Sequence, residues 1–379
     1  MLLEYGAKNF FSFKEGFEIS FCNSKSIATV IALKGANASG KTNAIKALSF
    51  LSWFAVSSFS KLQPNEKIPF SPFFHNKDEI TELYARFLYE GIEYIYELEL
   101  TKDQVVKETL YKKEKRLTKV LERCGDKLSY ISKKMKDLKA IKINRSNASI
   151  ISIANQYEIE AVEPFYRLFK NIFTNVGVYG KQPNEKIFTS YTEISKFYAN
   201  HRDIFDFVVD FLKKADTGID NIEIVEKEDP ETGEKLFVPI FLFKIDGETR
   251  ELSFYEQSNG VQSLYIQLGF YATVLKDGMV LALDEFDINL HPDLLPWIVN
   301  FFEDETFNKN HAQFIFTTHN NEIMDRLGKY RVVFVNKEEN ESYLYRLDEI
   351  PGDMLRNDRP ITPVYQANKI GGRPRISNA

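Results

Sequence analysis

Three predominantly apolar runs along the chain predict buried strands, at residues 30–34, 279–283 and 314–317. Strands of a parallel sheet that is covered on both faces have this composition. Helical periodicity follows the first run from residue 41, and another helical segment after residue 292 leads to the third run. Apolar strands that alternate with helices predict a parallel sheet with helices on its faces.

The residues between these runs follow other patterns. Residues 81–113 alternate apolar and polar side chains, with Gly91 at a hairpin turn, and therefore predict antiparallel sheet. Residues 150–215 have helical periodicity and are rich in Phe and Tyr, and residues 220–254 return to strands. The pattern thus predicts an α/β protein with an additional antiparallel part.

Charge is distributed unevenly along the chain. The formal net charge of −5 at pH 7 does not indicate a nucleic-acid-binding protein. Residues 112–145, however, contain thirteen Lys or Arg and four Asp or Glu, an excess of nine positive charges. Such a stretch either contacts nucleic-acid phosphate, a phage component or an acidic partner, or is a solvated lysine-rich arm. The residue pattern leaves both readings open.

The sequence shows no sign of secretion or of membrane insertion. No basic run followed by an apolar core opens the chain, and the fourteen uncharged residues 47–60 are too few to span a bilayer. The two cysteines, Cys22 and Cys124, are far apart and lack a metal-ligand spacing. We therefore expect a soluble, cytoplasmic protein with no membrane partner.

A phosphate-binding loop is predicted between the first strand and the helix that follows it. Residues 35–42 read G-A-N-A-S-G-K-T and fit the pattern G-x-x-x-x-G-K-[ST]. Gly35 and Gly40 let the backbone curl, so that its N–H groups and the positive end of the helix face phosphate. Lys41 is expected to reach the β- and γ-phosphate oxygens of ATP, and Thr42 to supply a hydroxyl to Mg²⁺.

Acidic and basic side chains end the other two strands. Asp284 is suited to hold Mg²⁺, directly or through water, and Glu285 is suited to polarise the attacking water. His319 follows the third run, at the edge where ligands bind in open parallel sheets, and is predicted to hydrogen-bond the γ-phosphate. Ser258 can cap a further helix through the compact turn Asn259-Gly260, and these residues by themselves indicate only a helix start.

The order of these motifs resembles that of a known family. A phosphate loop, a Ser-x-Gly turn, an apolar strand with Asp-Glu and a strand with His follow one another as in the ABC-type ATPase heads of the SMC and RecF group. The chain is most similar to the bacterial OLD-like AAA ATPases. The segments that carry the resemblance are KNFFSF (8–13), DEFDINLHP (284–292), QFIFTTH (313–319) and, loosely, YQANKIGGRP (365–374). It covers the first hundred residues and about residues 245–379.

The resemblance implies a P-loop NTPase head of the ABC type, with a mostly parallel core sheet, an antiparallel β lobe and an inserted helical and basic subdomain. Residues 1–105 would form the N-terminal half of the head, residues 106–220 the insertion and residues 221–379 the C-terminal half. The implied site residues have four roles. Walker A would comprise Gly35, Ala36, Asn37, Ala38, Ser39, Gly40, Lys41, Thr42 and the adjoining Asn43; Walker B would be Asp284 with the catalytic Glu285; His319 would be the switch histidine; and Ser258, Asn259 and Gly260 would be the signature turn.

The resemblance also implies partners. In such ATPases the signature turn of one subunit binds the γ-phosphate of ATP held by the other, which predicts a homodimer or a higher homo-oligomer. The chain has no sustained heptads for a coiled-coil arm and lacks room for a C-terminal Toprim nuclease. The implied function is therefore Mg²⁺-dependent ATP hydrolysis that controls a separately encoded effector, in phage defence. The alternatives are a RecF-like DNA-binding repair ATPase and a non-hydrolysing scaffold, against which the intact Glu285 argues.

Three positions depart from the family's pattern. Asn259 stands where the fuller signature has glycine, and His291 stands where many ABC ATPases place the aspartate of the D-loop. Gln156 is the candidate for the Q-loop glutamine. These departures leave open how well the chain hydrolyses ATP and at what rate.

Overall fold

Two units of structure share the chain. The computed structural model describes residues 1–23, 26–76, 79–140, 144–181, 190–215, 217–229, 232–288, 290–352, 354–356 and 359–373. The first unit comprises residues 1–181, 279–286 and 313–379, and the second comprises residues 182–278 and 287–312. Among the described residues, no helix combines the length and the apolar character that crossing a membrane requires.

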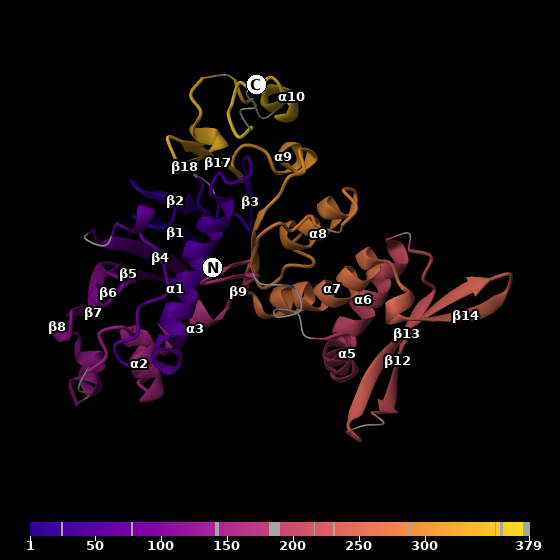
Figure 1. The fold of residues 1–379 in the computed structure, drawn as a ribbon, viewed down its shortest axis with the longest axis horizontal. Coiled ribbons are helices and arrows are strands. Elements are labelled where there is room, and N and C mark those ends of the chain that lie inside the picture. The colour runs from indigo at the N-terminus through magenta and orange to yellow at the C-terminus, as the bar shows by residue number, and fades with distance from the viewer. Residues whose placement is uncertain are drawn as a thin grey trace. The chain divides into compact units, whose positions relative to one another are not determined.

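A six-stranded sheet lies in the first unit and contains the three strands predicted from the apolar runs (Figure 1). All neighbouring strands are parallel except β17 and β18, which pair antiparallel at one edge of the sheet. In spatial order the strands are β18 (Glu341–Arg346), β17 (Val332–Glu338), β3 (Val30–Lys34), β16 (Gln313–Thr317), β15 (Val280–Leu283) and β9 (Ile172–Thr174). Every residue of β3, β15 and β16 is buried, as expected for central strands covered on both faces.

An antiparallel sheet of seven strands forms the other large part of the first unit. Its strands, in spatial order, are β2 (Phe17–Ser20), β1 (Leu2–Lys8), β4 (Thr81–Tyr89), β5 (Ile92–Leu100), β6 (Val105–Lys113), β7 (Leu117–Cys124) and β8 (Lys127–Ile131). The basic stretch therefore continues this sheet through β7 and β8 and then forms the 3₁₀ helix η2 (Lys133–Ala140). Residues 141–143 of that stretch lie outside the described residues.

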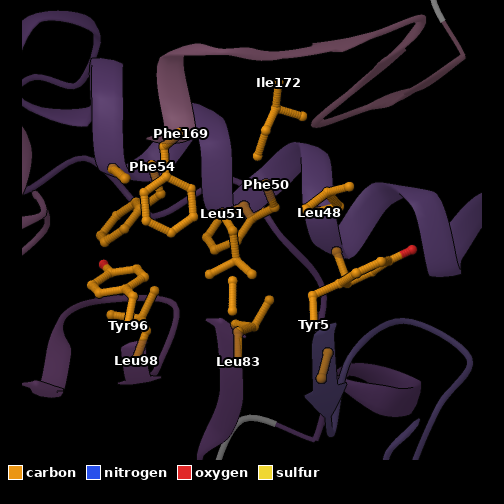
Figure 2. Packing of buried hydrophobic residues seen from close by; sticks show 14 of the residues in the cluster. Tyr5, Leu48, Phe50, Leu51, Phe54, Leu83, Tyr96, Leu98, Phe169 and Ile172 are labelled. Atoms are coloured by element: carbon orange, nitrogen blue, oxygen red, sulfur yellow. The ribbon is translucent and has the colours of Figure 1, made fainter. Parts of the chain in front are cut away.

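Helix α1 (Lys41–Lys61) packs between the two sheets of the first unit. Its buried side chains Leu48, Phe50, Leu51 and Phe54 face Leu83, Tyr96 and Leu98 of the antiparallel sheet, as Figure 2 shows. The same apolar cluster includes Ile31, Ala282 and Ile315 of the parallel sheet. A helix buried on all sides is apolar around its circumference, which explains the long uncharged stretch in the sequence.

The remaining elements of the first unit are short. They are α2 (Ile150–Gln156), η3 (Glu160–Val162), α3 (Glu163–Lys170), β10 (Val176–Gly177), β11 (Gly180–Lys181), α9 (Glu322–Leu327) and α10 (Thr362–Gln366), with η1 (Phe73–His75) and η5 (Leu347–Glu349). Helices α2 and α3 pack against α1, and Phe169 of α3 meets the ring of Tyr96 edge-on at 5.2 Å between centroids.

The second unit combines helices with a three-stranded antiparallel sheet. Its elements are α5 (Tyr191–Asn200), α6 (Arg202–Lys214), β12 (Asn221–Glu228), β13 (Lys235–Ile245), β14 (Glu248–Ser253), η4 (Phe254–Glu256), α7 (Asn259–Asp277) and α8 (Leu294–Glu303). The rings of Phe241 on β13 and Tyr265 on α7 lie 5.5 Å apart and join sheet and helix. The helices predicted after residues 258 and 292 are present as α7 and α8.

Candidate functional site

The loop of residues 35–42 joins β3 to the first turn of α1, and two glycines fix its course. A Cβ atom on Gly35 would lie 2.1 Å from the carbonyl oxygen of Val335. Gly40 has φ +112°, and a Cβ atom there would lie 2.5 Å from Ser342 Oγ. Only glycine fits positions with so little space and, at Gly40, a left-handed backbone. The loop is therefore held tightly against the β17–β18 hairpin.

The first turn of α1 is left open to an anion. It contains no acidic residue, and Gly40 at the N-cap provides no side-chain hydrogen bond to the helix. The N–H groups of a first helical turn have no partner within the helix, and with the positive end of the helix dipole they favour a negative group at this place. The Lys41 ammonium donates to the carbonyls of Gly35 at 3.0 Å and Ala36 at 2.9 Å, which holds it over the loop. Asn37 and Ala38, at the tip of the loop, are exposed.

Thr42 and Asp284, 242 positions apart in the sequence, meet at the site. Thr42 Oγ1 donates to Asp284 Oδ2 at 2.7 Å, and Thr317 Oγ1 donates to Asp284 Oδ1 at 2.7 Å. Asp284 follows β15 and Thr317 ends β16, so the carboxyl ends of adjacent parallel strands place them together. The buried carboxylate is thereby fixed beside the start of α1.

Two further contacts orient the acidic pair. The side chain of Asn175, at the end of β9, accepts from the backbone N–H of Asp284 at 2.7 Å and donates to its carbonyl at 2.8 Å. The backbone N–H of Glu285 donates to Thr317 Oγ1 at 2.6 Å. Glu285 has φ +52°, a conformation that costs energy in a residue with a side chain and that the surrounding hydrogen bonds maintain.

His319 lies in the loop that follows β16, and its side chain is exposed. The ammonium of Lys34, the last residue of β3, donates to the carbonyls of His319 at 2.9 Å and Asn320 at 3.2 Å. Lys34 is buried and also lies over the ring of Tyr365, 5.3 Å from its centroid. The strand that leads into the glycine loop therefore also anchors the loop that carries His319.

A chain of polar contacts supports the glycine loop from outside. Asn43 Nδ2 donates to Ser12 Oγ at 2.8 Å, and Ser12 Oγ and Ser342 Oγ form a hydrogen bond of 2.7 Å. Ser342 Oγ is also within hydrogen-bond distance, 2.7 Å, of the carbonyl of Ser39. Residues from the turn after β1 and from β18 thus hold the loop, although Ser342 belongs to no sequence motif.

Lys46 is a buried cation on the next turn of α1. Its Nζ lies 3.9 Å from the centroid of the Phe11 ring, an arrangement that stabilises the charge in place of water. Burial lowers the pKa of Lys46, and the negative charge of Asp284 acts in the opposite direction. The positive field of this lysine reaches the carboxylate that the site holds.

The residues of the predicted signature turn belong to the second unit. Ser258 caps α7, and its Oγ accepts from the N–H of Val261 at 3.3 Å. Ser258 and Asn259 are exposed and Gly260 is half-buried. His291 is also exposed in this unit and lies beside Asp293, with Nδ1 and Oδ2 3.6 Å apart.

Gln156 lies away from the glycine loop. It ends α2, and Ser152 of that helix hydrogen-bonds Val56 and Phe59 in the C-terminal half of α1. Residue 59 is eighteen positions beyond Lys41, roughly 27 Å along a helix. Asn175, which sequence reasoning missed, is the amide side chain that touches the acidic pair. The sequence feature that could have identified Asn175 is an amide side chain directly after the short β-prone segment 172–174.

The residues present fit ATP and Mg²⁺. The cradle of Gly35 and Gly40 leaves room for no side chain, and the hydroxyl–carboxylate pair of Thr42 and Asp284 offers the oxygen ligands that Mg²⁺ prefers. In the part of the chain that the structure describes, no group of three or more His, Cys, Asp or Glu side chains is arranged to hold a metal. Mg²⁺ bound here would therefore complete its coordination with phosphate and water.

Comparisons with known proteins identify a family model that matches the chain and solved structures that resemble it. A family model described as "AAA domain, putative AbiEii toxin, Type IV TA system" matches residues 30–325. No curated protein matches the chain. Similar solved structures include the SMC head domain from Thermotoga maritima, with 17% identity, a TM-score of 0.46 and coverage of 91% of this chain and 98% of that one.

Two further structures are Smc head domains from other organisms. One, with an extended coiled coil and bound to the C-terminal domain of ScpA, derives from Pyrococcus furiosus, with 14% identity, a TM-score of 0.46 and coverage of 92% of this chain and 97% of that one. The other, with a coiled coil and joint, derives from Pyrococcus yayanosii, with 11% identity, a TM-score of 0.47 and coverage of 97% and 99%. Identity this low carries no information about activity.

Proposed function

Because the chain belongs to the AAA-domain family whose model matches residues 30–325, we propose that it is an ATPase that binds ATP on the loop of residues 35–42. The observation that carries the proposal is the 2.7 Å hydrogen bond from Thr42 Oγ1 to Asp284 Oδ2. It joins the end of a glycine-lysine loop, which follows β3, to the carboxylate that follows β15, two strands away in the same sheet. P-loop NTPases use such a hydroxyl and carboxylate to hold Mg²⁺ beside the phosphates.

Each residue of the site has a role in this proposal. The loop N–H groups and the Lys41 ammonium bind the β- and γ-phosphates, and Thr42 with Asp284 holds Mg²⁺. Mg²⁺ bound there would neutralise negative charge on the phosphates. Glu285 accepts the proton of the attacking water, and His319 hydrogen-bonds the γ-phosphate. Asn175 and Thr317 keep the two acidic residues in position.

We further propose that the complete site needs two copies of the chain. The exposed Ser258, at the start of the nineteen-residue helix α7, would present its hydroxyl and the helix N-terminus to the γ-phosphate of ATP held by another copy. ATP then acts as a ligand that joins subunits, and hydrolysis separates them. The resemblance to ABC-type heads supports this step.

The biological role that we propose is control of a separately encoded effector, in defence against phage. The family description names a putative toxin of a Type IV TA system, which suits a chain that acts together with a partner. ATP-dependent assembly would be the signal that the effector reads. Purification of the chain with its neighbouring gene product, with and without ATP, tests this role.

Glu285→Gln tests hydrolysis and assembly together. Loss of the proton acceptor is expected to slow turnover by at least about 100-fold. ATP binding should persist, because the phosphate contacts are unchanged, and light scattering with ATP and Mg²⁺ should show a stable oligomer. Glu305→Gln, an identical change at an exposed position, serves as the control and should behave as the unaltered protein.

Lys41→Ala should abolish ATP binding and, with it, assembly. An unchanged monomer mass for Glu285→Gln in ATP would contradict the two-copy site but not ATP hydrolysis. Undiminished ATP turnover in Lys41→Ala would contradict the assignment of the loop itself.

A further inference from the structure

The basic stretch encloses a hollow in the first unit. The β6–β7 hairpin, the residues that follow β8, and the segment η3–α3 surround a cavity of about 640 Å³. The backbone N–H of Ser132 donates to the carbonyl of Val120 at 2.9 Å and ties the segment after β8 to β7. The basic residues are therefore part of a shaped wall, and not of a separate arm in solvent.

The floor of this hollow is apolar. Tyr94 on β5 and Phe165 on α3 are almost wholly buried, and their rings meet edge to face with centroids 5.1 Å apart. Val120, Ala161 and Pro164 complete the floor. Rings and aliphatic side chains packed in this way form a firm surface against which a flat apolar group can lie.

The rim of the hollow is cationic. Its charged residues are one carboxylate, Glu114, and six cations, namely Lys112, Lys115, Arg116, Lys119, Lys133 and Lys134. Lys112 pairs with Glu114 at 2.6 Å, and this hydrogen bond, with a smaller effect of Lys134, lowers the pKa of the Glu114 carboxyl. Lys119 pairs with Glu122. The single carboxylate on the rim is thus already engaged, and a large positive excess remains at the opening.

Buried apolar side chains beside several exposed cations suit an anion with a compact apolar body. The volume lies within the range of roughly 300–1,000 Å³ typical of small-molecule sites. A charged surface that served only solubility would have no need to converge on a hollow. Arg and Lys at the rim favour phosphate, which accepts several charge-assisted hydrogen bonds.

We propose that this hollow binds a nucleoside phosphate, with the phosphate on the rim at Lys115, Arg116 and Lys134 and the base against Val120, Ala161 and Pro164 of the floor. None of these residues belongs to the loop at 35–42, so the site is additional to the proposed ATPase site.

Calorimetric titration of the full chain tests the site. Lys41→Ala provides the background, so that binding at the glycine loop does not contribute. AMP is the principal probe. The single-stranded oligonucleotide dT12 shows whether the hollow binds a free nucleotide or a nucleic-acid strand. We expect saturable AMP binding with a dissociation constant below about 1 mM that weakens as salt is added. dT12 should bind no more tightly than AMP.

Two changes separate the rim from the floor. Replacing Lys115, Arg116 and Lys134 by Gln should weaken AMP binding by about tenfold or more, since several exposed charge pairs are lost. The matched control replaces the exposed Lys61, Lys127 and Lys309 by Gln, with the same change in net charge and no loss of affinity.

The floor is tested without any change of charge. Ala161→Trp should fill the hollow and weaken AMP binding by about tenfold. Leu117→Trp changes an exposed residue of the β6–β7 hairpin that does not line the hollow, and it should have no effect. Thermal unfolding of each variant verifies that it folds.

Three results would overturn the proposal. The first is AMP binding that the control triple variant weakens as much as the rim variant. The second is affinity for AMP that survives Ala161→Trp in a folded protein. The third is tight binding of dT12 with none of AMP, which would assign the rim to nucleic acid.

Discussion

Thr317 is the residue on which the acidic pair depends most directly. Its hydroxyl donates to Asp284 and accepts from the backbone of Glu285. It is fully buried, so water cannot replace either contact. The position of the proposed proton acceptor is thus determined by a neutral side chain on the neighbouring strand.

Thr317→Val keeps the shape of this side chain and removes its hydroxyl. Two buried polar groups lose a partner, which should destabilise the site by about 1–3 kcal/mol. We expect kcat for ATP hydrolysis to fall by at least about tenfold, while the affinity for ATP changes little, because the phosphate contacts remain. Steady-state kinetics and titration with ATP measure the two effects. Thr317→Ser, which retains the hydroxyl, should recover most of the rate; equal losses in both variants would contradict the role.

Glu93 provides a pH-dependent contribution to stability. Partial burial raises the pKa of its carboxyl, but hydrogen bonds from Lys113 and Arg86 outweigh this effect and leave the pKa below its usual value of 4.5. A carboxyl whose pKa is lower in the folded chain stabilises it above pH 4.5 and loses this contribution as the pH falls below that value.

Glu93→Gln should therefore lower the free energy of unfolding at pH 7 by about 1–2 kcal/mol, the low end for charged hydrogen bonds because Lys113 is partly exposed. Near pH 3 the difference from the unaltered protein should shrink. Urea unfolding at the two pH values measures this. Glu15→Gln, whose exposed pair with Lys14 spans 3.8 Å, should show no difference at either pH.

At the scale of elements, the β17–β18 hairpin forms the back of the glycine loop. Val335 and Ser342 leave no room for a Cβ atom on Gly35 and Gly40 respectively, and Ser342 lies within hydrogen-bond distance of both Ser39 and Ser12. The shape of the loop is therefore imposed by strands about three hundred residues further along the chain.

Ser342→Ala should weaken ATP binding by about five- to tenfold, because the Ser39 carbonyl loses a partner and the loop loosens. The turnover of bound ATP should change less than the affinity. Equilibrium titration and steady-state rates separate the two. Tyr343→Phe, a change of one exposed hydroxyl on the same strand, serves as the control. A Ser342→Ala protein with unaltered affinity would remove the hairpin from the site.

Elements differ in how far the sequence determines them. Strands β3, β15 and β16 follow from their apolar composition, to within one residue at each end. β9 was missed because three residues within a predicted helical segment carry little pattern, and the strand exists only by pairing with β15. β7 and β8 were missed because few of their residues are buried, so apolar and polar side chains do not alternate clearly, and the basic stretch was therefore predicted to be an insertion. The contact between Ser12 and Ser342 spans 330 positions and leaves no local signal.

At the scale of the molecule, each unit has buried apolar residues of its own. Those of the first unit include the cluster around α1, and those of the second include Leu268 on α7, which is fully buried. The loop of residues 35–42 and Asp284 both belong to the first unit, so ATP should stabilise that unit directly.

Calorimetry should therefore resolve two unfolding transitions. ADP, which lacks the γ-phosphate that Ser258 of another copy would contact, should stabilise the first unit by about 2.7 kcal/mol at about one hundred times its dissociation constant. Leu268→Ala should destabilise the second unit by about 2–5 kcal/mol through loss of packing. Each change should move a different transition; one transition that both changes displace equally would show that the units unfold as one.

The β17–β18 hairpin has a practical consequence for the design of truncated variants and for searches that rely on motifs alone. A shortened chain that ended soon after His319 would still contain every predicted site residue. It would nevertheless lack the β17–β18 hairpin against which Gly35 and Gly40 pack. The loop would then not be held in the conformation that binds phosphate.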